Sequence, residues 1–139
     1  MELPLDLLKL GVNRGSILLS DSFEDIDHAK FFAVIGISQD KLAGFFFINS
    51  RIHPIIMSKS RLLEMQFLLR KEDYKFLSYD SYLGANEVQV RTVDKIATSM
   101  QNGQTSIVGE LTKDDLEKVL EACRNSDLFS EKEKSQFFY

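Results

Sequence analysis

The sequence DSYLGANEVQVRTVDK, at residues 80–95, decides the fold. Short runs of β-branched and aromatic residues separated by Gly84 and Asn86 predict two neighbouring strands. The residues that follow predict a short helix, which Gly103 ends, and then another strand. The expected elements are strands at 76–84, 87–92 and 105–111 and a helix at 93–101.

Two helices are expected after this segment. Thr112 with Asp115, and Ser130 with Glu133, have the spacing of a capping box, in which two side chains satisfy exposed backbone N–H groups. Leu116, Val119, Leu120 and Cys123 follow the first box as one apolar stripe at helical spacing.

The first half of the chain also favours strands. Residues 16–19, 31–37 and 44–48 are dense in Phe, Val, Ile and Leu, and 38–41 predicts a hairpin connection. The pattern in residues 51–75 is mixed, and it favours one strand at 64–69. Residues 3–10 predict a short helix or an irregular arm, and 21–30 a loop. Short strands with turn signals and peripheral helices are typical of a small, barrel-like sheet.

Composition limits the possible classes of protein. A chain of 139 residues with 44% hydrophobic residues is expected to form one globular domain. We expect the sheet at about 15–111 and the C-terminal helices at about 112–138. The single Cys123 excludes an internal disulfide and a zinc site built from cysteines. The acidic start and the absence of a long apolar run predict a cytoplasmic protein with no membrane segment.

Charge is unevenly distributed along the chain. The net charge is −4, yet residues 51–100 carry eight Lys and Arg against six Asp and Glu. A basic zone between two acidic ends can contact phosphates, although a solvated loop would have the same composition.

Several segments resemble the MazF/PemK-type toxins in order and spacing. Residues 15–18 resemble the family's opening Gly-Asp-Ile-Val strand, and 30–35 resemble its Arg-Pro-Val-Val-Ile strand. Residues 48–50 resemble its Ile-Thr-Ser element, while 80–81 and 91–94 match its later Asp-Ser and Arg-Thr-(Ile/Val)-Asp motifs. The resemblance implies a mainly β fold, an SH3-like barrel with peripheral and C-terminal helices. It also implies a homodimeric toxin that is paired with an antitoxin protein.

The resemblance further implies an endoribonuclease that uses no metal or other cofactor. Such toxins cleave single-stranded RNA by driving the ribose 2′-OH onto the adjacent phosphate. Lys30 takes the position of the family's catalytic Arg, and Asn49 that of its catalytic Thr, with Ser50 beside it. Lysine is a single flexible charge where arginine is a planar fork, and asparagine cannot relay a proton as a hydroxyl does.

Nearby residues are candidates to complete this site. His28 is the candidate acid and base, since histidine titrates near neutral pH. Either Ser50 or Arg51 is expected to complete the phosphate site. Arg51 is preferred because it would restore the guanidinium that Lys30 lacks, and it shares one strand face with Asn49 if the strand continues. We therefore expect His28, Lys30, Asn49 and Arg51 to line one groove. Asp80 and Ser81 are better explained by a hydrogen bond at a strand end.

Other functions remain open. The chain could be a catalytically degenerate barrel that binds RNA or protein, or a mobile-element protein directed against another protein. The aromatic runs at 45–47 and 137–139 could stack on bases. Because strand residues alternate between faces, at least one of Phe45 and Phe46 is expected to leave the barrel core and to meet a partner subunit.

Overall fold

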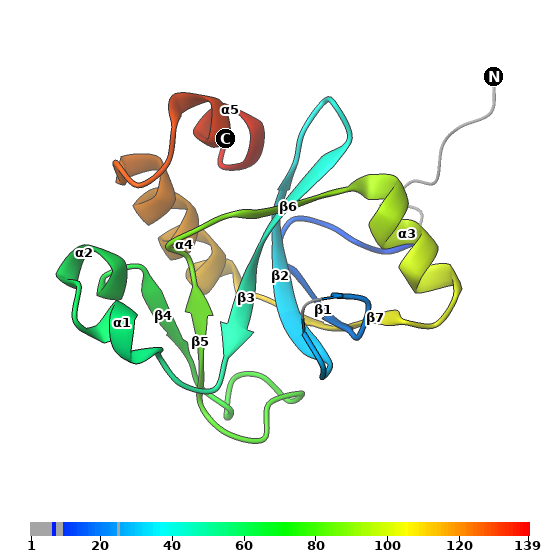
Figure 1. Cartoon of the computed structure of the whole chain (residues 1–139), viewed down its shortest axis with the longest axis horizontal. Coiled ribbons are helices and arrows are strands. Elements are labelled where there is room, and N and C mark those ends of the chain that lie inside the picture. The colour runs from blue at the N-terminus through cyan, green and yellow to red at the C-terminus, as the bar shows by residue number, and fades with distance from the viewer. Residues whose placement is uncertain (1–6, 8–9, 25) are drawn as a thin grey trace.

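The computed structural model describes residue 7, residues 10–24 and residues 26–139. In that part of the chain, seven strands form one antiparallel sheet with five helices around it (Figure 1). The strands are β1 (Ser16–Ser20), β2 (Lys30–Ile37), β3 (Leu42–Asn49), β4 (Gln66–Leu69), β5 (Ser81–Gly84), β6 (Gln89–Thr92) and β7 (Thr105–Glu110). The helices are α1 (Pro54–Met57), α2 (Ser60–Leu63), α3 (Val93–Gln101), α4 (Lys113–Asn125) and α5 (Glu131–Phe137). The predicted mainly β class with peripheral and C-terminal helices is confirmed.

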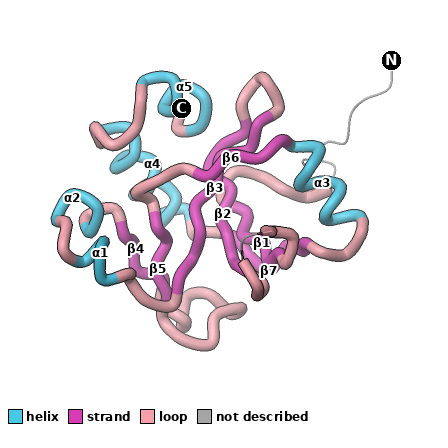
Figure 2. Tube along the Cα trace, viewed as in Figure 1, coloured by secondary structure: helices cyan, strands magenta, loops and turns pink. Residues whose placement is uncertain are grey.

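Strand β3 pairs with three other strands of the sheet. It pairs with β2 along one edge, and along the other edge it pairs first with β6 and then with β5. The hydrogen-bonded order is β4-β5-β3-β2-β1-β7, with β6 joining β3 outside this path. Figure 2 shows the strong twist of the strands, which follows from the chirality of the backbone.

The chain itself covers both faces of this sheet. Phe45 and Phe46 point to opposite sides, and their exposed fractions are only 1% and 0%. We call the Phe46 side the α4 face, because its apolar cluster includes residues of α4 and α5. We call the Phe45 side the α3 face, because it packs Phe32 and Phe45 against Val93, Ile96 and Ala97 of α3. The expectation that an outward Phe needs a partner subunit to cover it was therefore wrong.

Two of the three residues in the C-terminal aromatic run are also buried, whereas Tyr139 is 71% exposed. Phe137 and Phe138 are 1% and 0% exposed and belong to the core on the α4 face. Arg14 donates hydrogen bonds to the carbonyl oxygens of Phe137 and Tyr139 at 3.1 and 2.8 Å. Arg124 donates to the carbonyl oxygen of Phe138 at 2.5 Å. Neither buried ring is available to stack on a base.

Tyr74 completes the cap of helix α4. The Thr112 side chain accepts a hydrogen bond from the N–H of Asp115, as predicted. The reciprocal bond of the box was wrongly predicted, because the Asp115 carboxylate accepts instead from the Tyr74 hydroxyl at 2.5 Å. That hydroxyl in turn accepts from the N–H of Thr112 at 3.1 Å. Aspartate is shorter than the glutamate that usually closes such a box.

The second predicted capping box is complete. The Ser130 hydroxyl accepts from the N–H of Glu133 at 3.1 Å, and the Glu133 carboxylate accepts from the N–H of Ser130 at 2.9 Å. Helix α5 therefore begins one residue after Ser130, at Glu131.

The middle of the chain differs most from the sequence prediction. The strand expected at 76–84 is regular only from Ser81, because residues 76–80 form an irregular segment that crosses the sheet end. The strand expected at 64–69 is confirmed at Gln66–Leu69, with the short helix α2 before it. Of the helix or arm expected at 3–10, only residues 7 and 10 lie within the described residues. Among the described residues, no helix has the length and apolar composition needed to cross a bilayer.

Candidate nucleic-acid interface

Lys30 and Asn49 lie opposite each other at the ends of two paired strands. The β2–β3 register pairs Phe31 with Ile48, so Lys30 at the start of β2 faces Asn49 at the end of β3. The Lys30 ammonium donates a hydrogen bond to Oδ1 of Asn49. By strand alternation, both side chains lie on the same side of the sheet as Phe47, which is the α3 face. Of the four residues expected to line one groove, Lys30 and Asn49 do meet.

The charge of Lys30 has no acidic partner within the described part of the chain. Its ammonium lies 5.5 Å from the ring centroid of Phe47. Burial lowers the pKa of Lys30, because the charged form loses part of its hydration. The ammonium is thus held by a neutral amide and a ring, which leaves a half-buried positive charge that an anion can neutralise.

Further polar and aromatic side chains continue this surface across β5 and β4. The β3–β5 register pairs Asn49 with Tyr82, which is partly exposed. Gln66 lies opposite Gly84 and donates a hydrogen bond to Oδ1 of Asn86 at 2.8 Å. Gly84 carries no side chain, so the sheet is open between the amides of Gln66 and Asn49. The surface formed by Lys30, Phe47, Asn49, Gln66, Tyr82 and Asn86 is called the Lys30 surface below.

His28 and Ser50 lie around a neighbouring cavity. This cavity has a volume of about 230 Å³ and is also lined by Lys30, Phe31 and Ile48. Because Phe31 and Ile48 point to the α4 face, the cavity lies on the opposite side of the strand ends from the Lys30–Asn49 hydrogen bond. The Nδ1 atom of His28 is 2.9 Å from the carbonyl oxygen of Ala29. His28 and Ser50 therefore line one cavity with Lys30 but do not converge on its ammonium.

Arg51 does not join Lys30 as expected. Strand β3 ends at Asn49, and Ser50 and Arg51 form a bend, so the alternation that placed Arg51 beside Asn49 stops there. Arg51 is exposed and does not line the cavity that holds Ser50 and Lys30. Ser50, the other residue expected to complete the site, lines that cavity together with Lys30. The expected groove of His28, Lys30, Asn49 and Arg51 is not formed.

Asp80 and Ser81 have local structural contacts. A carboxylate oxygen of Asp80 accepts a hydrogen bond from the N–H of Lys71 at 2.9 Å. The Ser81 hydroxyl donates to the carbonyl oxygen of Tyr79 at 3.1 Å. These bonds tie the start of β5 to the preceding turn, as the strand-end interpretation predicted.

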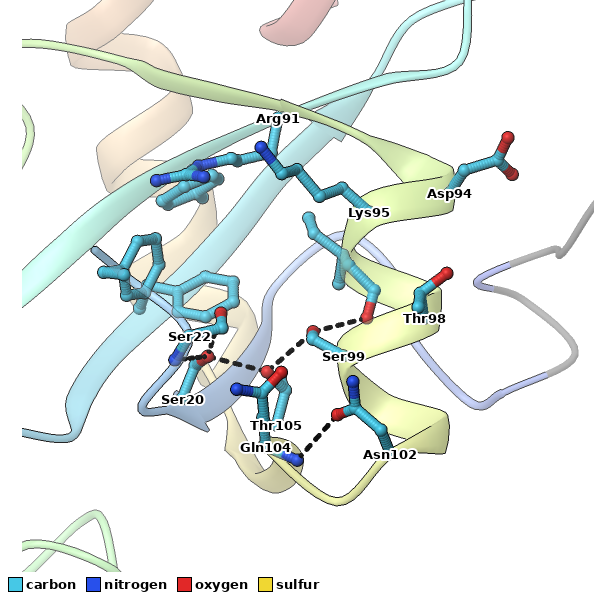
Figure 3. Close-up of a pocket in the computed structure, with 14 residues that line it drawn as sticks. Ser20, Ser22, Arg91, Asp94, Lys95, Thr98, Ser99, Asn102, Gln104 and Thr105 are labelled. Carbon is cyan, nitrogen blue, oxygen red and sulfur yellow. Dashed lines mark hydrogen bonds between the residues drawn. The ribbon is translucent and has the colours of Figure 1, made fainter.

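Sequence reasoning missed a second cavity on the α3 face. It has a volume of about 370 Å³, and Figure 3 shows it between α3 and the strand ends of β1 and β7. Arg91 and Lys95 lie at one end of it, with the hydroxyl groups of Ser20, Ser22, Ser99 and Thr105 along one side. The signal was weak, because Phe23 lies in a polar segment without periodicity and yet is only 7% exposed.

Comparison of the chain with protein-family models and with curated proteins finds no match. The resemblance to the MazF/PemK-type toxins therefore rests on the sequence motifs alone.

Proposed function

We propose that this protein binds single-stranded RNA on the Lys30 surface. The observation that carries the proposal is the Lys30–Asn49 pair, a half-buried cation held by a neutral partner at the positions of the resembling family's catalytic residues. A phosphate could form an ion pair with the Lys30 ammonium and accept a hydrogen bond from the amide nitrogen of Asn49. That nitrogen makes no hydrogen bond to any described residue. Phosphate contacts of this kind supply most of the affinity for nucleic acid.

The aromatic side chains beside this pair suit a single strand better than a duplex. Phe47 and Tyr82 are partly exposed and flank Asn49 on the same face. Stacking of a base on an aromatic side chain contributes about 1–3 kcal/mol and tolerates any base. The Asn86 amide nitrogen can donate to base edges or to the ribose, and Oε1 of Gln66 can accept from them, since the two Gln66 amide hydrogens already go to Leu62 O and Asn86 Oδ1. A single strand exposes its bases to such contacts, whereas a duplex keeps them stacked inside.

RNA cleavage by a toxin is the second candidate function. It is favoured by the same pair, because a cation and an amide donor can stabilise the charge that develops on the phosphate when a 2′-OH attacks it. Proton transfer would need a group near this phosphate, and the sequence candidate, His28, lies instead at the cavity on the other side of the strand ends. The homodimer and the antitoxin partner are parts of this second proposal.

The test is binding of a fluorescent single-stranded RNA of about twelve nucleotides, measured by anisotropy at several salt concentrations. We expect Lys30→Ala to weaken binding by about tenfold and to make the salt dependence shallower by about one charge. Lys118→Ala, an exposed charge on α4, is the matched control and should bind like the wild type. Unchanged binding by Lys30→Ala would refute the proposal.

Cleavage is tested on the same RNA in the presence of EDTA. The toxin reading predicts products with 2′,3′-cyclic phosphate ends, and no cleavage of an RNA with 2′-deoxyribose at the cut site. Binding without these products favours the degenerate, non-cleaving barrel.

A further inference from the structure

The second cavity on the α3 face combines an aromatic floor with polar walls. Phe23, Phe32, Phe45 and Ile96 form its apolar side, and Phe23 packs edge-on against Phe32 with ring centroids 5.6 Å apart. A volume of about 370 Å³ lies within the range of cavities that hold small ligands. An apolar cavity with a few placed polar groups is the usual form of such a site.

Two cations lie at one end of this cavity. The Arg91 guanidinium carbon is 5.0 Å from the ring centroid of Phe23, and Figure 3 shows the Lys95 side chain extending toward Arg91. The Asp94 carboxylate points away from them on the outer side of α3 (Figure 3). Neither cation forms an ion pair with any residue that the structure describes. Their positive charges are therefore available to an anionic group.

A chain of hydroxyl groups leaves one hydrogen-bond donor for a ligand. Ser20 Oγ accepts from the Thr105 hydroxyl at 2.7 Å and from the N–H of Ser22 at 3.1 Å. Its own hydrogen is then left for Ser22 Oγ, 2.7 Å away. The Ser22 hydroxyl therefore accepts from Ser20, and its own hydrogen is not donated to either Ser20 or Thr105. Of Ser20, Ser22 and Thr105, only Ser22 is partly exposed. A ligand in the cavity can accept this hydrogen.

Amide groups complete the wall beyond the hydroxyl groups. Oδ1 of Asn102 accepts from the N–H of Gln104 at 3.2 Å, which orients the Asn102 amide and leaves its nitrogen as a donor. The Gln104 side chain lines the cavity and makes no hydrogen bond to a described residue. Its amide can both donate and accept, which is what the edge of a nucleobase requires.

The cavity is continuous with the Lys30 surface through two aromatic rings. The rings of Phe23 and Phe47 are in edge contact, with centroids 5.1 Å apart. Lys30 lies over Phe47 and Arg91 lies over Phe23, so two cations bracket the two rings on one sheet face. A strand that places one phosphate at Lys30 would have its neighbouring nucleotides directed along this path.

We infer that this cavity binds one unstacked nucleotide, with its base against Phe23 and Phe32 and its phosphate at Arg91 and Lys95. The Ser22 hydroxyl and the amides of Asn102 and Gln104 would meet the polar edge of the base. The inference rests on the proposed RNA function, since it takes the nucleotide from the strand held at Lys30. The same chemistry also fits a free nucleoside monophosphate, and the test separates these two sources.

The experiment titrates the 139-residue chain with each of the four nucleoside 5′-monophosphates, with the matching nucleosides and with inorganic phosphate, by calorimetry or chemical-shift changes. We expect at least one monophosphate to bind. Its nucleoside and inorganic phosphate should each bind at least about tenfold more weakly. Arg91→Gln and Lys95→Gln should each weaken the monophosphate by about tenfold, because each removes a charge-assisted contact. Ser22→Ala should have a smaller effect, and Lys118→Gln none. Circular dichroism of each variant checks that it folds.

Parallel titrations with the single-stranded RNA separate the two proposals. If monophosphates bind and the RNA does not, the RNA function fails while a free nucleotide becomes the occupant. If the RNA binds through Lys30 but Arg91→Gln and Lys95→Gln bind it normally, the cavity inference alone fails. Absence of monophosphate binding in the wild type, or equal binding of inorganic phosphate, also overturns the cavity inference.

Discussion

The ring of Phe137 packs directly on the backbone of Gly44, so that helix α5 contacts β3 near its start. A Cβ atom built on Gly44 would lie 2.6 Å from Cγ of Phe137. The neighbouring Gly36 of β2 is closer still, because its Cβ would lie 2.1 Å from the carbonyl oxygen of Phe137. Two glycines on paired strands, which are poor strand formers, are thus explained by the helix that packs on them.

We predict that Gly44→Ala lowers the free energy of unfolding by about 1–3 kcal/mol, as expected for overpacking. Gly36→Ala should cost more, because its clash is with backbone rather than with a ring. Gly84→Ala on β5 is the matched control, since its Cβ would make only ordinary contacts at 3.4 Å or more. Urea titration of the three variants measures the differences, and equal stabilities of Gly44→Ala and Gly84→Ala would contradict this packing.

Tyr74→Phe should destabilise the protein by about 1–2 kcal/mol, because it leaves the Thr112 N–H and the Asp115 carboxylate without this partner. Burial, with the bond to Asp115 as a second cause, raises the pKa of Tyr74 above its ordinary value. A raised pKa means that the contribution is complete at neutral pH and is lost as pH rises through the folded-state value. Unfolding measured at neutral and alkaline pH should show the gap between wild type and Tyr74→Phe closing as pH rises. A gap that is constant with pH would count against this linkage.

As pH rises, the wild type should lose its affinity for RNA at a lower pH than the Lys30→Arg variant does. Burial lowers the pKa of Lys30, so its charge is lost at a lower pH than that of an exposed lysine, whereas arginine stays charged. The charged form is the one disfavoured by folding, so deprotonation of Lys30 does not itself unfold the protein. Anisotropy titrations along a pH series check this, with circular dichroism as the folding control. Parallel loss in both proteins would show that another group controls binding.

Cys123 should resist thiol reagents in the folded protein. Burial raises the pKa of its thiol to about 12, and the side chain is 0% exposed, so the reactive thiolate is scarce and covered. At mildly alkaline pH we expect reaction with a disulfide reagent to be at least about a hundredfold slower than in urea-unfolded protein. Equal rates in the two states would mean that the helix α4 stripe is not packed as described.

Local patterns in the sequence predicted the elements that are stabilised locally. The strands at the Phe-rich segments, helix α3 and the cap of α5 follow from composition, glycine positions and the Ser130–Glu133 spacing. The irregular path of residues 76–80 could not be predicted, because it depends on contacts distant in sequence, such as the ring of Phe76 against Phe31 at 4.9 Å.

The candidate site was predictable only in part, for the same reason. Lys30 and Asn49 meet because two strands pair in register, which the hairpin pattern anticipates. Arg51 was misplaced because its predicted position assumed that the strand continues past Asn49, and side chains alternate between faces only within a strand. Arg91, Phe23 and Ser22 come together only through tertiary packing, so no spacing in the sequence signals the cavity that they line.

The most direct test of the central claim is a chemical-shift map of single-stranded RNA on the isotope-labelled protein. We predict that the largest backbone shifts occur at Lys30, Asn49 and Tyr82 on the α3 face, and that residues of α4 and α5 change little. Lys30→Ala should abolish these shifts at equal RNA concentration while Lys118→Ala leaves them intact. Shifts confined to α4 and α5, or none at RNA concentrations near the millimolar limit of weak binding, would contradict the claim that this sheet face binds RNA.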